Sequence, residues 1–264
     1  MISGSSESLE KKSPENRVAL ITGSGKGVGA GIIRVFTKAG IRCCINCNTN
    51  RAMADELLKE VESYGGEAFI YQADVTDPEM RKGMVDAVLE HYGRLDILVN
   101  NAAMQPNRFI DGYDEETFRW LWNINIGGYF HMVRECLPYL KESPEGRIIN
   151  ISSVHGKRPT SFDAGYATTK GAIRMFTREL ALELLPTGIT VNAIDLGGCK
   201  IEFKTGNAKW VTYHPMEINN PTMKRVNLQV LPTEVGDVVY FLCSKEGKAI
   251  NGHAVRVDNG LLLT

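Results

Sequence analysis

The stretch RVALITGSGKGVG (Arg17–Gly29) joins a short apolar run directly to a turn that is rich in glycine. The run RVALIT has the length and the uniform apolarity of a strand that is buried on both faces of a sheet. Helical spacing follows from Val28 to Ala39, and Gly40 ends it. We therefore expect a strand, a tight turn and a helix in this order.

The same alternation continues along the rest of the chain. Further strands are expected at RCCIN, EAFIYQ, DILVN, GRIINIS and ITVNAID, and further helices at 52–64, 78–92, 115–140 and 163–185. Short apolar strands that alternate with helices imply a parallel sheet covered on both faces, and right-handed crossovers make it doubly wound. No shift in composition marks a second domain. Residues 17–264 are expected to form a single α/β domain of the Rossmann type.

Two segments do not follow this alternation. Residues 1–16 are polar, and we expect them to form a flexible arm. Residues 197–232 are rich in turn residues and show no clear period. Loops at the carboxyl ends of parallel strands line the ligand crevice, so this second segment is predicted to be a substrate lid.

Composition limits the classes of partner. The formal net charge of -1 leaves no excess of basic residues for the phosphates of a nucleic acid. No apolar run approaches the roughly 20 residues that span a bilayer. The 6 cysteines lack metal-binding spacing and are expected to be reduced thiols in the cytoplasm. We therefore expect a cytoplasmic protein without a nucleic-acid partner, a membrane partner or a metal site.

The glycine-rich turn TGSGKGVG (Thr22–Gly29) has the features of a dinucleotide site. Glycines allow a tight turn and a close approach of the backbone to a pyrophosphate, whose charge the helix N-terminus favours. The residues predicted to bind the cofactor here are Gly23, Ser24, Lys26, Gly27, Val28 and Gly29. The alternative is a glycine-rich turn that binds no ligand.

The choice between NAD(H) and NADP(H) depends on a position about 20 residues further, near the end of the second strand. An acid there would accept a hydrogen bond from the ribose 2′-hydroxyl. The segment INCNTNR (Ile45–Arg51) contains no acid and offers Asn48, Thr49 and Arg51 as donors, with Lys26 in the turn. Donors and cations without a carboxylate suit a phosphate, so NADP(H) is preferred and NAD(H) remains possible. The alternative is that Lys26 and Arg51 are solvated surface charges.

The motif YATTK (Tyr166–Lys170) carries a phenol and an ammonium one helical turn apart. A free phenol has a pKa of about 10, and a fixed ammonium nearby lowers it by stabilising the phenolate. Ser153 follows an apolar strand and could bind the same carbonyl oxygen that the phenol protonates. A solvated surface pair is the alternative for the motif alone. Together with the cofactor turn, the pair predicts a proton-transfer site.

These motifs, in this order, resemble the short-chain dehydrogenase/reductase family over about Arg17 to Gly260. The segment NNAA is similar to the family's NNAG stretch, ADV to its acidic adenine contact, and NINIGGYF to its asparagine segment. The resemblance implies further cofactor contacts at Asp74, Val75, Asn101, Ala102, Tyr166, Lys170 and Gly197. It implies a catalytic set of Asn125, Ser153, Tyr166 and Lys170.

The resemblance also implies a mechanism, which is hydride transfer between nicotinamide C4 and a carbonyl or alcohol carbon. Ser153 would hold the substrate oxygen, and Tyr166 would pass the proton. Lys170 would bind the nicotinamide ribose and lower the pKa of the tyrosine. Asn125 would hold a water that continues the proton path. Family members commonly form homo-oligomers, so a tetramer or a dimer is expected.

The chain departs from the family pattern at four positions. Ala103 replaces the last glycine of NNAG, and Asn259 replaces a glycine in DNG. In DLGGCKI, Leu196 and Ile201 stand where the family has a proline and a threonine. The last two changes predict an altered contact to the nicotinamide and leave the catalytic residues intact.

The substrate is predicted from the residues around the serine. SSVH (Ser152–His155) is similar to the glucose and sugar dehydrogenase branch, and His155 could donate to a sugar hydroxyl, although a solvated loop histidine is the alternative. Ser153 and Glu202 are further candidates for substrate binding. We expect a sugar, polyol or sugar acid as the carbonyl or alcohol substrate. A 3-oxoacyl-thioester reductase and a non-catalytic NADP(H)-binding sensor are the alternatives.

Overall fold

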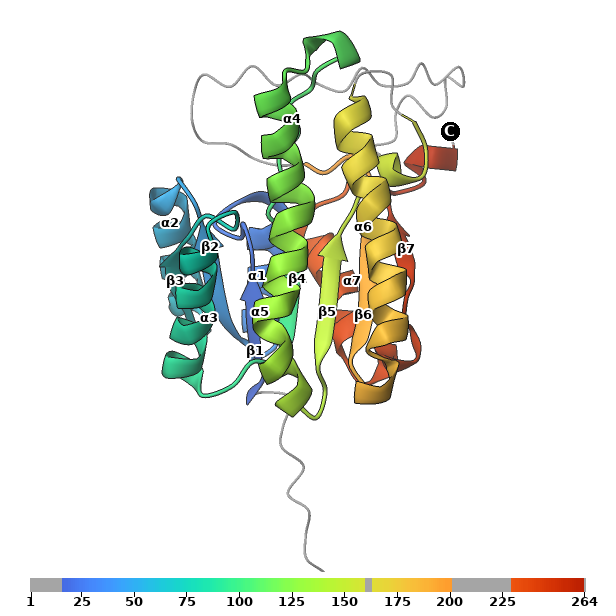
Figure 1. The fold of residues 1–264 in the computed structure, drawn as a ribbon. Helices are drawn as coiled ribbons and strands as arrows, with labels where there is room; N and C mark the ends of the chain where they lie inside the picture. The colour runs from blue at the N-terminus through green and yellow to red at the C-terminus, as the bar shows by residue number, and fades with distance from the viewer. Residues whose placement is uncertain (1–15, 160–162, 201–228, 264) are drawn as a thin grey trace, which may run out of the picture.

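The computed structural model describes residues 16–159, 163–200 and 229–263, which form three layers (Figure 1). The strands of this part are β1 (Val18–Ile21), β2 (Arg42–Cys47), β3 (Ala68–Gln72), β4 (Ile97–Asn100), β5 (Arg147–Ile151), β6 (Thr190–Leu196) and β7 (Ala254–Val257). The α-helices are α1 (Gly27–Lys38), α2 (Arg51–Ser63), α3 (Pro78–Tyr92), α4 (Glu115–Trp122), α5 (Tyr129–Glu142), α6 (Ala164–Glu183) and α7 (Pro232–Cys243). Residues 1–15 of the predicted arm and 201–228 of the predicted lid, with Ile201 and Glu202, lie outside the described residues.

The strands form one parallel sheet in the order β3-β2-β1-β4-β5-β6-β7. Every strand pairing in it is parallel, as at β1 and β2, where Leu20 lies opposite Cys44. The predicted doubly wound fold is confirmed. From β1 the chain adds β2 and β3 on one side, and then β4 to β7 on the other. Ligands of such sheets bind at the carboxyl ends of the strands beside this switch point, which lies between β1 and β4.

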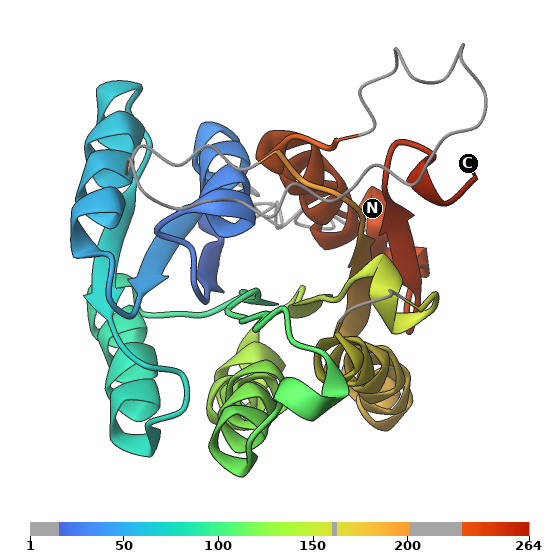
Figure 2. The ribbon, with the colours of Figure 1, turned by 90° about the horizontal axis from the view of Figure 1, so that it is seen from above.

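The sheet is apolar on both faces because each face is covered by helices (Figure 2). Helices α1, α2 and α7 cover one face, and Ala19 and Ile21 of β1 pack in the core beneath them. Helices α3, α5 and α6 cover the other face with Val18 and Leu20. Successive residues of a strand point to opposite faces, so β1 has no position for a polar side chain.

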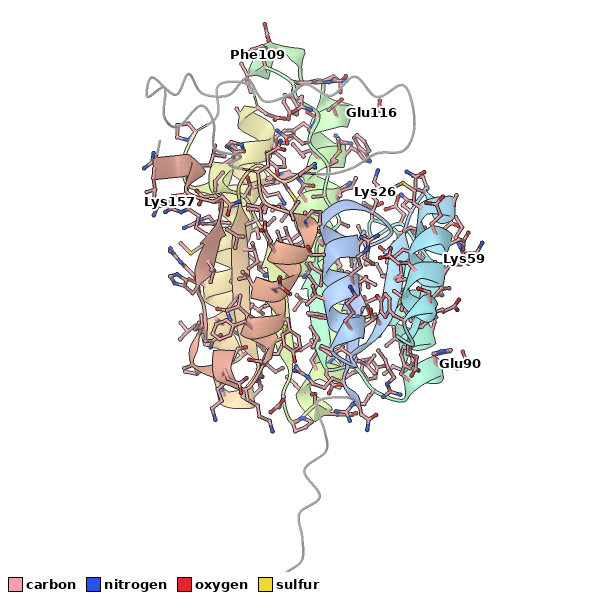
Figure 3. All side chains as sticks on the ribbon, turned by 180° about the vertical axis from the view of Figure 1, so that it is seen from behind. Lys26, Lys59, Glu90, Phe109, Glu116 and Lys157 are labelled. Atoms are coloured by element: carbon pink, nitrogen blue, oxygen red, sulfur yellow. The ribbon has the colours of Figure 1, made fainter. Side chains whose placement is uncertain are left out.

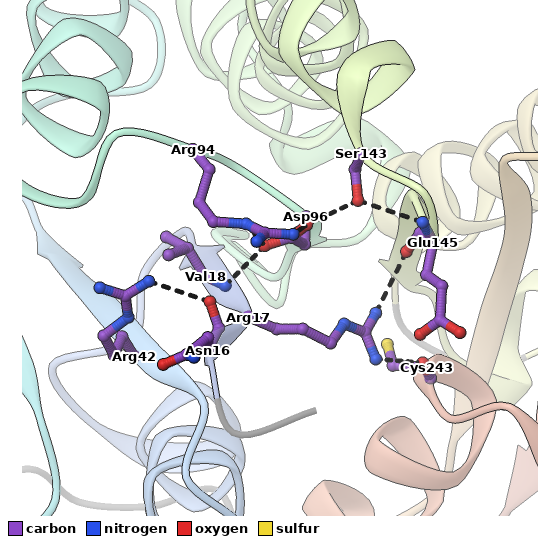
Figure 4. A network of polar contacts seen from close by, with 9 residues as sticks. All are labelled: Asn16, Arg17, Val18, Arg42, Arg94, Asp96, Ser143, Glu145 and Cys243. Atoms are coloured by element: carbon purple, nitrogen blue, oxygen red, sulfur yellow. Dashed lines mark hydrogen bonds and ion pairs between the residues drawn. The ribbon is translucent and has the colours of Figure 1, made fainter. Parts of the chain in front are cut away.

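A polar network closes the amino ends of the strands (Figure 4). The buried carboxylate of Asp96 accepts hydrogen bonds from the amide of Val18 and from Ser143, and forms two bonds with Arg94. Burial raises the pKa of Asp96, but the bonds from these three partners outweigh it and hold the pKa below its usual value. Beside it, the guanidinium of Arg17 donates to two backbone carbonyls. This end of the sheet is therefore fixed by structural contacts.

The helical stretch predicted for 115–140 is confirmed as continuous, but it is not uniformly α-helical. Between α4 and α5 lies a π-helical segment, η3 (Asn123–Gly128), which contains the buried Asn125. Such a wider turn often marks a functional site. No helix of the described residues is long and apolar enough to cross a bilayer.

Candidate functional site

The glycine-rich turn between β1 and α1 has the backbone of an anion site. Gly23 and Gly27 adopt positive φ angles of 61° and 58°, which favour glycine. Among the described residues no side chain caps the start of α1, and the first turn of this helix carries no acid. The first amides of the helix are therefore available to a phosphate, which the helix dipole also favours.

The same turn leaves no room for side chains at two of its glycines. A Cβ at Gly23 would lie 2.8 Å from Cα of Ala102, and one at Gly29 would lie 2.6 Å from Cα of Ser24. Asn101 closes the turn from β4, because its side-chain amide donates to the carbonyls of Thr22 and Gly23. The residues present thus fit a pyrophosphate cradle. The NNAA segment supports the back of it.

Asn46 of β2 is a supporting residue of this turn that sequence reasoning did not identify. It is 1% exposed, and its Oδ1 accepts from the amide of Gly23 at 2.9 Å. Its Nδ2 donates to the carbonyls of Tyr71 and Ala73 at the end of β3. An asparagine inside the apolar strand RCCINC is the signal that could have revealed it, since a buried amide needs partners.

The predicted ribose-phosphate contacts lie together at the carboxyl end of β2. Asn48 donates to Asp74 at 2.9 Å, and Asp74 also accepts from the amide and the hydroxyl of Thr76. Arg51 lies at the start of α2 and pairs with Asp55 at 2.9 Å. Both members of that pair are about half exposed, so the guanidinium stays open to a further anion. Lys26 is the N-cap residue of α1, which follows β1, the strand next to β2 (Figure 3).

Tyr166 and Lys170 share one face of α6, as predicted. Lys170 is 2% exposed, and its Nζ lies 5.5 Å from the centre of the Tyr166 ring and 5.7 Å from that of Tyr129. Nζ donates to the carbonyl of Ile151 at 2.8 Å, and the Tyr129 hydroxyl donates to the same oxygen at 3.0 Å. The ammonium is thus held between two aromatic faces and the end of β5. Cation–π attraction favours its charged form there.

Burial lowers the pKa of Lys170 to about 7. Near neutral pH the amine therefore titrates, whereas an exposed lysine is fully charged. A group with this property, buried beside a phenol at the carboxyl ends of the strands, is typical of a catalytic site.

Ser153 caps the short 3-10 helix η4 (Val154–Gly156), which follows β5. Its hydroxyl accepts from the amide of His155 at 3.2 Å and lies 3.4 Å from the carbonyl of Leu196. The His155 ring lies edge-on to Tyr166, with ring centres 6.5 Å apart. Burial lowers the pKa of His155, and the charge of Asp163 opposes this shift. The structure thus places Ser153, His155 and Tyr166 close together, and their expected roles stay predictions.

The side chain of Asn125 is hydrogen-bonded to the loop after β4. Its Oδ1 accepts from the amide of Met104 at 2.9 Å, and its Nδ2 donates to the carbonyl of Met104 and to Thr169. These bonds join η3, the loop and α6. The water-holding role expected of this residue stays a prediction.

Gly197, a predicted cofactor contact, has a packing function in the described structure. Its amide donates to the carbonyl of Val257, and a Cβ would lie 2.6 Å from Cβ of Asp258. Asn259, which replaces a glycine in DNG, has a φ of 46°. Asparagine tolerates this conformation better than most residues, so the substitution is compatible with the turn.

Comparison with known proteins identifies relatives over nearly the whole chain. The family model described as short chain dehydrogenase matches residues 17–212. Glucose 1-dehydrogenase 2 of Bacillus subtilis (strain 168) is 31% identical over 254 residues, which cover 94% of this chain and 95% of that protein. A 3-oxoacyl-(acyl-carrier-protein) reductase, FabG of Thermotoga maritima, is 30% identical over 251 residues, which cover 94% and 99%.

A solved structure has the same fold. The short chain dehydrogenase from Burkholderia cenocepacia J2315, in complex with NADP, is 27% identical to this chain and superimposes with a TM-score of 0.83. The match covers 94% of this chain and 98% of that one.

Proposed function

The chain belongs to the short-chain dehydrogenase family and is an oxidoreductase. On this premise we propose that it interconverts the carbonyl and alcohol forms of a sugar, polyol or sugar acid with NADP(H). The observation that carries the proposal is the buried amine of Lys170, held 5.5 Å from the Tyr166 ring beside the end of β5. Such a pair can supply the proton that reduction of a carbonyl oxygen requires.

The proposed mechanism assigns one task to each of four residues. Bound NADP(H) supplies or accepts the hydride. In reduction, Ser153 donates a hydrogen bond to the substrate carbonyl oxygen, and Tyr166 gives that oxygen its proton. Lys170 in its ammonium form stabilises the resulting phenolate. Asn125 holds the water that returns a proton to the tyrosine, and in oxidation every proton moves in the opposite direction.

The preference for NADP(H) over NAD(H) is part of the proposal. The residues for the ribose phosphate are Lys26, Asn48, Thr49 and Arg51. The guanidinium of Arg51 is about half exposed, and Asn48, whose side-chain amide donates to Asp74, follows the end of β2. The Burkholderia cenocepacia relative, which was solved in complex with NADP, gives further support. Asp74 and Val75 would contact the adenine.

The sugar substrate is supported by the half-buried His155 beside Tyr166 and by the name of the Bacillus subtilis relative. The test is a panel of aldoses, polyols and sugar lactones alongside an acetoacetyl thioester, with NADPH and NADH absorbance as the readout. Turnover of sugars with preference for NADPH is expected. Turnover of the thioester alone would instead assign a 3-oxoacyl-thioester reductase activity, the activity for which the Thermotoga maritima relative is named.

We further propose a cytoplasmic homo-oligomer, a tetramer or a dimer, with α5 and α6 in the interface. Phe130 of α5 and Met175 of α6 are 49% and 55% exposed, and Phe130 contacts Phe176 of α6. Exposed apolar side chains on adjacent helices are typical of an interface. Light scattering of the wild type and of Phe130→Glu checks the oligomer, and the variant is expected to dissociate.

A further inference from the structure

The loop between β4 and α4, residues 101–114, is held to the rest of the molecule at both ends. At its beginning, the amide and the carbonyl of Met104 both bond to the side chain of Asn125. Further along, the amide of Asn107 and the hydroxyl of Tyr113 both donate to Asp163, at 2.9 Å and 2.5 Å. The β4–α4 loop is therefore tied to η3 at one side and to α6 at the other.

Asp163 joins this loop to the helix that carries the tyrosine and the lysine. It is the N-cap of α6, and the Oδ1 that accepts from Tyr113 also accepts from the amide of Tyr166 at 2.9 Å. The carboxylate is 2% exposed. A helix cap needs one acceptor, and serine or threonine supplies it equally well. The other oxygen, Oδ2, accepts from Asn107, and the second hydrogen bond of Oδ1 comes from Tyr113. Both of these bonds hold the β4–α4 loop.

The ring of Tyr113 fits this arrangement because Gly165 has no side chain. A Cβ at Gly165 would lie 2.7 Å from both Cζ and Oη of Tyr113. Burial raises the pKa of Tyr113, and its bond to Asp163 raises it further, so the phenol stays a donor. Asn107 has a φ of 56°, a conformation that non-glycine residues rarely adopt, and its bond to Asp163 helps to hold it.

Gln105 lies between the two fixed points, Met104 and Asn107. Its Nε2 is buried and has no hydrogen-bond partner in the described part of the chain. A buried donor without a partner destabilises a protein unless a ligand or water accepts from it. The loop follows β4, whose carboxyl end lies beside that of β5, where Ser153 begins η4. A molecule bound at this end of the sheet would offer such an acceptor.

We propose that Asp163 is a positioning residue: with Tyr113 it latches the β4–α4 loop against α6, and so it sets the amide of Gln105 to bind a substrate oxygen. The inference rests on the proposed oxidoreductase function of the same site. It adds residues that would determine substrate specificity to the residues that would transfer the proton.

Two variants test the latch without touching the carboxylate. Tyr113→Phe removes the hydrogen bond, and Gly165→Ala displaces the ring. Each is expected to raise KM for the carbonyl substrate about tenfold, the effect of one lost bond to a charged group, with smaller changes in kcat. KM for NADPH and the pH dependence of kcat should not change. Gly171→Ala is the matched control on the same helix, since a Cβ there would meet only an ordinary contact at 3.5 Å.

Two further variants separate the latch from the helix cap. Asp163→Ser keeps an acceptor for the amide of Tyr166 but removes the carboxylate that binds Asn107 and Tyr113. It should therefore have the same raised KM as Tyr113→Phe. Asp77→Ser on α3, where Asp77 caps through the amide of Met80, is the control and should leave KM unchanged. Gln105→Met should raise KM by a similar factor. It should add little when it is combined with Tyr113→Phe.

Hydrogen exchange of the peptide 104–113 gives a readout that needs no turnover. Faster exchange in Tyr113→Phe and Asp163→Ser, but not in the two controls, is the expected result. Unchanged exchange and unchanged KM in these variants would overturn the latch while leaving the proposed function intact. Faster exchange in a protein that reduces no carbonyl compound would overturn the proposed function and the role of Gln105 in substrate binding, and leave the structural latch.

Discussion

At the scale of single residues, the proposed chemistry of the site depends on one buried amine. Lys170 is enclosed by Tyr129, Tyr166 and the carbonyl of Ile151, and burial lowers its pKa to about 7. Its charge, which would stabilise the phenolate in the proposed mechanism, is therefore present below this pH and declines above it. Burial of an amine in this position lowers the stability of the folded protein.

That cost predicts a pH-dependent effect of Lys170→Met. The folded pKa lies below the unfolded value of about 10.4, so the unfolded chain binds more protons between these two values. The destabilisation caused by burying the charged amine is largest below about pH 7 and decreases as the pH rises toward 10. Lys170→Met, whose loss leaves Ile151 bonded to Tyr129, should therefore raise the free energy of unfolding by roughly 2 to 4 kcal/mol at pH 6.

Urea unfolding of both proteins from pH 6 to pH 10 measures this effect. The advantage of Lys170→Met should shrink steadily as the pH rises. Lys59→Met, on an exposed face of α2 (Figure 3), is the control and should show no such trend. A pH-independent difference for Lys170→Met would mean that the amine is not desolvated in the folded protein.

Sequence reasoning found the residues whose chemistry has a local signature and missed those that act across the fold. Tyr166 and Lys170 are one turn apart, so helical spacing alone predicts that they share a face. Asn46 and Asp163 act through partners 23 and 50 positions away, Gly23 and Tyr113. Nothing in the spacing of these residues predicts such contacts.

At the scale of elements, the close contact between α1 and α7 depends on two glycines. A Cβ at Gly31 would press into the backbone of Pro232, and one at Gly236 would lie 2.8 Å from Val35. Backbone cannot yield as a flexible side chain can. The two helices would separate if either glycine carried a methyl group.

Gly31→Ala is therefore expected to destabilise the protein by about 2 kcal/mol, although alanine is the better helix former by roughly 1 kcal/mol. Thermal unfolding measures the effect. Gly171→Ala on α6, which has room for a methyl group, should instead be neutral or stabilising. Equal stability changes in the two variants would contradict the close packing of α1 on α7.

The elements themselves were largely predictable, because each buried strand is a short apolar run and each helix carries an apolar stripe. The π-helical turn of η3 was not, since one wide turn leaves the hydrophobic spacing of the stretch 115–140 almost unchanged. It follows from tertiary contacts, in which the side chain of Asn125 bonds to Met104 and Thr169. The predicted lid lies mainly outside the described residues, and its role stays a prediction.

At the scale of the whole molecule, the two ends of the sheet have different tasks. The carboxyl ends carry the glycine-rich turn proposed to bind the cofactor, Ser153 and the β4–α4 loop. The amino ends are closed by the network around Asp96 (Figure 4). Stability and chemistry are therefore separated by the length of the strands, and changes at one end can be made without altering groups at the other.

Asp96→Asn tests this separation. The folded pKa of Asp96 is held below its unfolded value of about 3.9, so its contribution is present above that pH and is lost as the pH falls through the folded pKa. The variant should lose about 3 kcal/mol of unfolding free energy at pH 7, since it breaks a buried ion pair, and less at pH 3. Its kcat should match the wild type.

The control is Glu115→Gln in the exposed pair with Arg119, which is expected to cost under about 0.5 kcal/mol. Denaturant unfolding at both pH values, with kcat measured on the folded enzyme, provides the comparison. A large loss of kcat in Asp96→Asn would show that the two ends of the sheet are coupled.

The central claim is that Tyr166, supported by Lys170, transfers the proton to or from the substrate oxygen, and Tyr166→Phe tests it most directly. The variant keeps the ring and removes only the hydroxyl. NADPH oxidation should fall by about a hundredfold or more with the substrate that the screen identifies, while the Kd for NADPH from fluorescence titration changes less than about twofold. An unchanged rate with intact cofactor binding would contradict the account and favour a protein that binds NADP(H) without turning it over.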